Sequence, residues 1–136
     1  MKKYIPFLLL ASITVFSCNE EDASMVPDDC PEELFCTEEL RHLTYKATVN
    51  GEPTVLDDYY IKNLDNGLIY QKNPQNDFLD EGVYVVISDA LMDEVKKSGT
   101  ILRFFGIKNN TIVLQQDFIV GHDCCHVVPI SGPFED

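Results

Sequence analysis

The sequence predicts an all-β domain, a single antiparallel β-sandwich of about seven strands with one short helix. Apolar and polar residues alternate with a period of two in several short stretches, as in strands with one buried face. Turns containing Asn and Gly separate these stretches at nearly regular intervals. Only one short segment has a helical pattern, which is too little helix for an α/β sheet. A small closed barrel is the other architecture that this pattern allows.

The first half of the domain is expected to contain three strands. Alternation predicts the first strand over Leu43–Val49. Asn50-Gly51 follows it and favours a type I′ turn, because both central positions of that turn need positive φ. A second strand is expected near Tyr59–Leu64 and a third over Leu68–Gln71, joined by the turn Asp65-Asn66-Gly67.

The second half begins with a polar loop over Asn73–Gly82. The β-branched run Val83–Ser88 then predicts a strand that is buried on both faces. Ser88 or Asp89 can cap a helix of about two turns that Gly99 ends. The remaining segments are expected to be three strands and a frayed tail: Thr100–Ile107, Thr111–Val120, Cys124–Ile130 and Ser131–Asp136.

The N-terminus has the pattern of a secretory signal. Lys2 and Lys3 precede a run of about 12 mostly apolar residues, and the small residue Ser17 ends it. A spanning helix needs roughly 20 apolar residues, so a permanent transmembrane helix is the weaker interpretation.

The end of this signal, Val15-Phe16-Ser17-Cys18, resembles a bacterial lipobox, although Phe16 stands where a small residue is more common. The resemblance implies cleavage before Cys18 and lipid attachment to that cysteine, which anchors the chain to a membrane because each buried CH₂ contributes about 0.8 kcal/mol. Residues 1–17 would then be a lipoprotein signal peptide. The competing interpretation is an ordinary secretory signal with Cys18 as a free or paired thiol.

The acidic cluster Asn19-Glu20-Glu21-Asp22 follows the expected lipidation site. It resembles the surface-export signal of Bacteroidetes lipoproteins, which implies an outer-membrane protein that faces the cell exterior. A solvated acidic linker is the simpler explanation of the same residues. We therefore expect a lipidated acidic tether over residues 18–35 and a β-sandwich domain over residues 36–136.

The charge of the chain limits its partners. Ten basic residues oppose 23 acidic ones, for a formal net charge of −13. A chain this acidic repels nucleic acid and anionic lipid headgroups, so we expect no nucleic-acid partner. The expected partners are the membrane, through the lipid on Cys18, and another surface protein or a glycan.

The cysteines beyond Cys18 predict two disulfides, since an even number in an exported chain usually forms bonds. They are Cys30, Cys36, Cys124 and Cys125. On a strand, the adjacent pair near the C-terminus would point to opposite faces and could meet one upstream cysteine each. We disfavour pairing within each close pair, because a bond between neighbours is strained. The sequence does not choose between the other two connectivities.

A metal site is the alternative use of these residues. The stretch from His122 to His126 contains two histidines and two cysteines, which suit zinc or copper. The candidate ligands are His122, Cys124, Cys125 and His126, with Cys30, Cys36 and His42 available to complete the site. Their spacing fits zinc poorly, since paired ligands usually lie two to four residues apart. A reactive thiol pair is a third interpretation. No cofactor is expected.

Enzyme motifs are missing from the sequence, which contains no nucleophile elbow, phosphate loop or dinucleotide fingerprint. The acidic residues lack the alternating positions of a calcium loop. We therefore expect no catalytic residues and no enzymatic activity. The aromatic residues suit core packing, with one ring of each adjacent pair inside and one outside, and an exposed row would favour glycan binding. They are Tyr59, Tyr60, Tyr70, Tyr84, Phe104 and Phe105.

Over Cys36–Pro133 the chain resembles the carboxypeptidase regulatory-like, Ig- or transthyretin-type β-sandwich of many Bacteroidetes lipoproteins. The resemblance rests on the strand Leu40–Val49 with the turn that follows it, on Leu56–Tyr60, and on the ending Cys124–Val127 with Ser131-Gly132-Pro133. It implies an Ig-like fold and a non-catalytic accessory module. It implies no substrate, because a fold alone does not fix a function.

Overall fold

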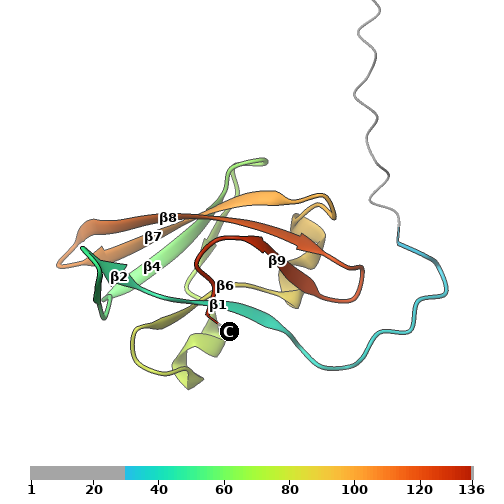
Figure 1. Cartoon of the computed structure of the whole chain (residues 1–136), viewed down its shortest axis with the longest axis horizontal. Coiled ribbons are helices and arrows are strands. Elements are labelled where there is room, and N and C mark those ends of the chain that lie inside the picture. The colour runs from blue at the N-terminus through green and yellow to red at the C-terminus, as the bar shows by residue number, and fades with distance from the viewer. Residues whose placement is uncertain (1–29, 136) are drawn as a thin grey trace, which may run out of the picture.

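The computed structural model describes residues 30–135; the expected signal peptide, Cys18 and the acidic cluster lie outside this range. The described chain is mostly antiparallel strand and forms a sandwich-like all-β fold, which confirms the predicted class (Figure 1). Its strands are β1 (His42–Lys46), β2 (Thr48–Val49), β3 (Glu52–Pro53), β4 (Asp58–Asn63), β5 (Ile69–Gln71), β6 (Val83–Ser88), β7 (Thr100–Lys108), β8 (Thr111–His122) and β9 (Val127–Ser131).

One layer is a five-stranded sheet in the order β5-β4-β7-β8-β9. All its pairs are antiparallel, and β7 lies at its centre between β4 and β8. The alternation seen in the sequence sets its two faces, because successive side chains of a strand point to opposite sides. In β4, for example, Tyr59 and Ile61 are buried while Tyr60 and Lys62 keep partial exposure.

The other layer is the pair β1-β6, which crosses beneath the five-stranded sheet in Figure 1. All six residues of β6 are buried, as the β-branched run predicts. Two short 3-10 helices contact this strand: η1 (Pro74–Phe78) and η2 (Asp89–Glu94). In Figure 1, η1 lies below β1 and β6, on the side away from the five-stranded sheet.

The predicted tight turn at Asn50-Gly51 is present, but it joins shorter strands than expected. Asn50 and Gly51 have φ values of 54° and 83°, as a type I′ turn requires. The expected strand Leu43–Val49 is interrupted at Ala47, where β1 ends its pairing with β6 and β2 begins to pair with β3. The turn therefore forms a two-residue hairpin at one end of the molecule.

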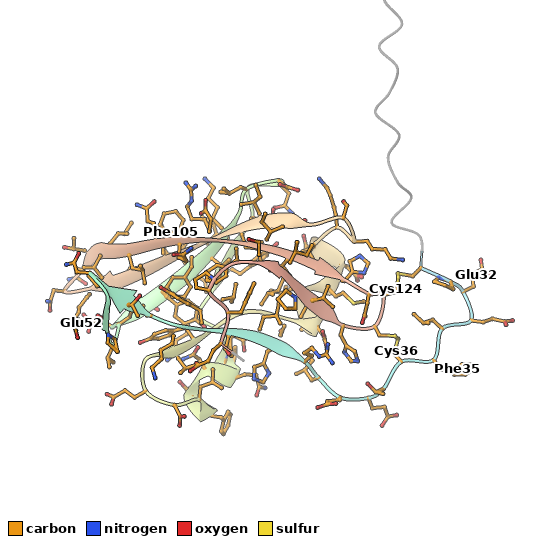
Figure 2. All side chains as sticks on the ribbon, in the orientation of Figure 1. Glu32, Phe35, Cys36, Glu52, Phe105 and Cys124 are labelled. Atoms are coloured by element: carbon orange, nitrogen blue, oxygen red, sulfur yellow. A yellow bond between two sulfur atoms is a disulfide. The ribbon has the colours of Figure 1, made fainter. Side chains whose placement is uncertain are left out.

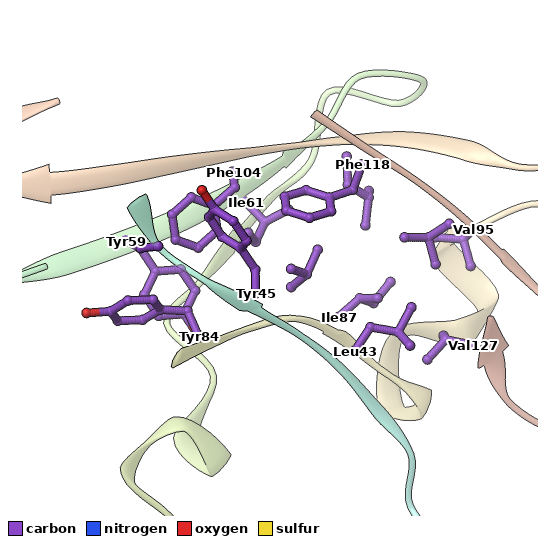
Figure 3. Packing of buried hydrophobic residues seen from close by; sticks show 14 of the residues in the cluster. Leu43, Tyr45, Tyr59, Ile61, Tyr84, Ile87, Val95, Phe104, Phe118 and Val127 are labelled. Carbon is purple, nitrogen blue, oxygen red and sulfur yellow. The ribbon is translucent and has the colours of Figure 1, made fainter. Parts of the chain in front are cut away.

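The core between the layers is aromatic at one end and aliphatic at the other (Figure 3). Tyr59 stacks on Phe104 at a centroid distance of 5.1 Å, and Tyr45 meets Phe104 edge-on at 5.4 Å. Burial of the Tyr59 side chain raises its phenolic pKa to about 12. The aliphatic end includes Val127, which directly follows the Cys124–His126 turn in the sequence.

A side chain completes the outer edge of β6. The Asn76 amide oxygen accepts a hydrogen bond from Val85 N–H at 2.8 Å, and the amide nitrogen donates to the Val83 carbonyl at 3.3 Å. The Tyr59 hydroxyl donates to the same Asn76 oxygen at 2.9 Å. Asn76 thus makes the hydrogen bonds that a neighbouring strand would make.

The predicted helix is wrong in type and length. The segment forms η2, which ends at Glu94, is kinked at Leu91, and gives way to extended backbone at Val95. Ser88 makes no side-chain cap hydrogen bond, and the Asp89 carboxylate binds groups far away in the sequence. The local capping signal therefore serves another purpose, and an α-helix does not form.

The C-terminal segment also differs from expectation. β9 begins at Val127, so Cys124 and Cys125 lie in the turn before it and not on a strand. The expected frayed tail is held down as far as Glu135, whose N–H donates to the Thr44 carbonyl at 2.9 Å. The ring of Phe134 packs against Phe118 at 4.9 Å.

Candidate functional site

Two disulfides join the N-terminal segment to the turn between β8 and β9. Cys30 pairs with Cys124, and Cys36 pairs with Cys125. Figure 2 shows both at the end of the molecule where the N-terminal segment meets the sandwich. The pairing is one of the two connectivities that the sequence left open. It also fixes residues 30–35, which we assigned to the tether, covalently against the domain.

The turn that holds the adjacent cysteines is shaped by Asp123. Its Oδ1 accepts the N–H of Cys125 at 3.0 Å and the N–H of His126 at 2.8 Å. These hydrogen bonds lower the pKa of the Asp123 carboxyl. Cys124 adopts a φ of 79°, a left-handed conformation that turns the chain. The conformation of this turn, and not the alternation of side chains along a strand, therefore directs the two cysteines to separate partners.

His126 is buried beside this turn and is engaged through both ring nitrogens. Nδ1 lies 2.8 Å from Oδ2 of Asp89, and Nε2 lies 2.9 Å from Oγ1 of Thr37. Because a carboxylate only accepts hydrogen bonds, Nδ1 carries a proton and donates a hydrogen bond to Asp89. The other ring nitrogen, Nε2, makes the hydrogen bond with the Thr37 hydroxyl. The imidazole thereby ties the segment after Cys36 to the sandwich.

The Asp89 carboxylate is a junction for three chain segments. Its Oδ1 accepts the N–H of Val127 at 2.8 Å, and its Oδ2 accepts the N–H of Arg41 at 2.6 Å as well as the His126 ring proton. Burial opposes ionisation, but these hydrogen bonds outweigh it and lower the pKa of Asp89 below its ordinary value. Asp89 therefore stays ionised at neutral pH.

His122 is the last residue of β8, before the turn, and lies close to the Cys30–Cys124 disulfide. Its Nδ1 accepts the N–H of Cys124 at 3.1 Å. One ligand atom each from Cys30, His122 and Cys124 lie within 4.8 Å of one another. Since the two sulfur atoms are bonded to each other, neither is a thiolate in this structure.

The structure thus divides the sequence-predicted cluster. His122 and Cys124 lie together with Cys30, whereas Cys125 bonds to Cys36 and His126 binds Thr37 and Asp89. Sequence reasoning missed Thr37 and gave Asp89 no role in a site, but only those of a possible helix cap and a solvated loop carboxylate. No local signal marks either residue, because they lie 89 and 37 positions from His126.

A second candidate site is the outer face of the five-stranded sheet. Residues paired across strands share a face, so the register places four uncharged side chains in one row over four strands: Gln71, Tyr60, Phe105 and Gln115. The next row contains Ile69, Lys62, Arg103 and Asp117. None of these eight side chains is fully buried, and Figure 2 shows Phe105 on the face away from β1 and β6.

The two aromatic rings in this row form a ridge. Tyr60 and Phe105 stack with 13° between their planes and 4.7 Å between their centroids. That separation equals the spacing of neighbouring strands, about 4.7–4.9 Å, so the rings stand upright on the sheet. The register places Gln71 beside the other face of Tyr60 and Gln115 beside the other face of Phe105.

Two of the three charged residues in the row beside the ridge, Arg103 and Asp117, neutralise each other. Arg103 donates two hydrogen bonds to Asp117, from Nε to Oδ1 at 2.6 Å and from Nη2 to Oδ2 at 2.8 Å. The guanidinium lowers the pKa of the Asp117 carboxyl. In contrast to the chain as a whole, the middle of this face carries no excess of negative charge.

Comparisons of the chain with protein-family models, curated proteins and solved structures found no match. Among residues 30–135, no helix is long and apolar enough to cross a membrane.

Proposed function

We propose that this protein is a lipid-anchored, extracytoplasmic β-sandwich that binds a glycan through the outer face of its five-stranded sheet. The lipobox-like Val15-Phe16-Ser17-Cys18 supports the anchor, and the acidic residues after it support display on the cell exterior. Disulfides in the structure fit the oxidising compartment that such a chain enters. The observation that carries the binding function is the Tyr60–Phe105 ridge on an uncovered sheet face.

The chemistry of the ridge suits sugars. The partly exposed rings of Tyr60 and Phe105 can stack on the apolar face of a sugar ring. Each flanking glutamine amide offers two donors and an acceptor, which match neighbouring hydroxyl groups. The Tyr60–Phe105 row is uncharged, Arg103 is paired with Asp117, and Lys62 is the remaining charge in the next row, so the ridge itself fits an uncharged glycan.

Binding of the full chain to a panel of soluble uncharged polysaccharides tests this proposal. We expect retention by at least one polysaccharide, and we expect Tyr60→Ala or Phe105→Ala to weaken it about tenfold, the effect of losing roughly 1.4 kcal/mol of stacking. The matched control is Phe78→Ala, since Phe78 is 85% exposed but lies on η1, on the other side of the molecule. Binding that Phe78→Ala weakens equally would contradict the proposal.

The anchor has its own test. Mass spectrometry of the chain extracted from membranes should show that it begins at Cys18 and carries lipid, and Cys18→Ser should release the chain into the soluble fraction. A soluble wild-type chain would refute the lipid anchor while leaving the glycan site intact.

The proposal includes no catalysis, although Thr37, His126 and Asp89 have the hydroxyl–imidazole–carboxylate order of a hydrolytic triad. Asp89 also holds two backbone N–H groups, and Thr37 directly follows a disulfide-bonded cysteine, so the contacts serve to join segments. The wild type and His126→Gln should hydrolyse an activated ester equally slowly. Faster hydrolysis by the wild type would show that these residues are catalytic.

Metal binding is the second candidate function, and the grouping of Cys30, His122 and Cys124 favours it. Two thiolates and one imidazole are a ligand set for zinc, but they form only after the Cys30–Cys124 bond is reduced. Reduced Cys36→Ser/Cys125→Ser should then bind zinc, and oxidised protein should not. If the reduced variant does not bind zinc, this second function is wrong.

A further inference from the structure

The segment Cys30–Thr37 is a short loop that is fastened at three points. Cys30 and Cys36 are bonded to adjacent residues of one turn, so residues 30–36 close a covalent ring with Cys124 and Cys125. The Thr37 hydroxyl then meets Nε2 of His126 at 2.9 Å. Such a loop has little freedom left to lose when a partner binds it.

The fastened loop presents apolar side chains to solvent. Phe35 is 97% exposed and its neighbour Leu34 is 42% exposed. Figure 2 shows Phe35 at the outer side of the loop, pointing away from the sandwich. A fully exposed aromatic side chain contributes little to folding, whereas aromatic side chains are enriched among the anchors of protein interfaces.

The backbone of the loop is also outside regular secondary structure. Leu34, Phe35, Cys36 and Thr37 belong to no helix, strand or turn in the structure. The residues on either side of this stretch are acidic and exposed: Glu32, Glu33, Glu38 and Glu39. The partner that fits therefore has a cleft for an irregular segment, a deep apolar pocket, and a basic or neutral rim.

We propose that this loop inhibits an endopeptidase of chymotrypsin-like specificity by placing Phe35 in its primary apolar pocket. The Phe35–Cys36 peptide bond then lies where the enzyme cleaves. Hydrolysis of that bond would consume one water and give a Phe35 carboxylate and a Cys36 amine. The fragment that ends at Phe35 would remain linked through Cys30 to Cys124, and the fragment that begins at Cys36 would remain linked to Cys125. The products therefore could not separate and would continue to occupy the enzyme.

Inhibition of chymotrypsin by the full chain, purified with its cysteines oxidised, tests the proposal. We expect stoichiometric, reversible inhibition that Phe35→Ala weakens about 100-fold or more, as for a central aromatic anchor. Phe35→Lys should lose inhibition of chymotrypsin and gain inhibition of trypsin, whose pocket accepts a basic side chain. Since Phe35 touches solvent almost everywhere, neither substitution should alter folding.

The controls separate this site from the sheet face. Phe105→Ala should inhibit chymotrypsin as the wild type does, and Cys36→Ser/Cys125→Ser should be cleaved quickly because the loop is released. The proposal is overturned if the wild type leaves chymotrypsin fully active, or if chymotrypsin cuts the wild type as rapidly as it cuts the double variant. It is also overturned if Phe35→Lys leaves trypsin unaffected.

Discussion

The middle of the sandwich and its disulfide end are held together by different forces. In the middle, aromatic rings such as Tyr59 and Phe104 are buried between the two layers, and no covalent bond joins the layers there. At the disulfide end, two covalent bonds and the His126 hydrogen bonds hold a loop whose apolar side chains face water. The buried rings of the middle therefore stabilise the fold, whereas the disulfide end holds a segment that would not pack by itself.

Removal of both disulfides should have the largest effect on stability. Either bond alone closes a loop of about 90 residues, and the second then closes only a nine-residue ring. The chain-entropy model therefore gives a loss of about 2–3 kcal/mol for either bond and about 7 kcal/mol for both. Denaturant unfolding of the single and double Cys→Ser pairs measures this difference. Equal and additive losses would mean that the two bonds act independently.

Truncation of a core ring should cause the second-largest loss of stability and should leave the disulfide end unchanged. Phe104→Ala removes a fully buried ring and should destabilise the fold by about 3–5 kcal/mol. Its neighbour Phe105 lies on the outer face, so Phe105→Ala should cost only about 1 kcal/mol. Thermal unfolding of the pair tests the assignment of inner and outer faces, and a reversed order would contradict the register.

Asp89 links the two regions, so its loss should have an intermediate effect. In Asp89→Asn, the neutral amide replaces a carboxylate that accepts three hydrogen bonds, which should cost about 1–3 kcal/mol at neutral pH. The folded-state pKa of Asp89 is lowered, so its contribution is present above the ordinary carboxyl pKa and is lost as pH falls below about 4. The decrease in the free energy of unfolding between pH 7 and pH 2 should therefore be smaller for the variant than for the wild type. An identical pH dependence would contradict this role.

Thr37→Val should have the smallest effect. It removes one partly buried hydrogen bond to His126 and keeps the shape of the side chain, for a loss of about 0.5–1 kcal/mol. Local hydrogen exchange should rise in residues 37–41 and stay constant in β7. A loss as large as that of Asp89→Asn would show that Thr37 does more than fasten the loop.

Much of the sandwich could be predicted because its causes are local. Alternation alone separated Tyr59 from Tyr60 and Phe104 from Phe105, and the β-branched run marked β6 as fully buried. The Asn50-Gly51 turn followed from the need for positive φ. Pattern could not show that the first strand breaks at Ala47 to serve two different sheets, because that break depends on which strands are nearby.

The disulfide end was harder because its causes are distant in the sequence. Export context predicted that the four cysteines pair, but only the folded chain selects Cys30–Cys124 and Cys36–Cys125. Asp123 was an available signal for the turn, since Asp often hydrogen-bonds to backbone N–H groups two residues on. The use of Asp89 by His126 had no such signal, because the two residues lie 37 positions apart.

The Asn76 side chain has a consequence for how copies of this protein behave when crowded together. An open strand edge invites pairing with the same edge of a neighbouring molecule, which is the first step of ordered aggregation. By bonding to Val83 and Val85, Asn76 occupies the hydrogen-bonding groups through which β6 would recruit such a neighbour. A single amide side chain therefore protects the fully buried strand β6 from edge-to-edge polymerisation, and no additional strand is needed.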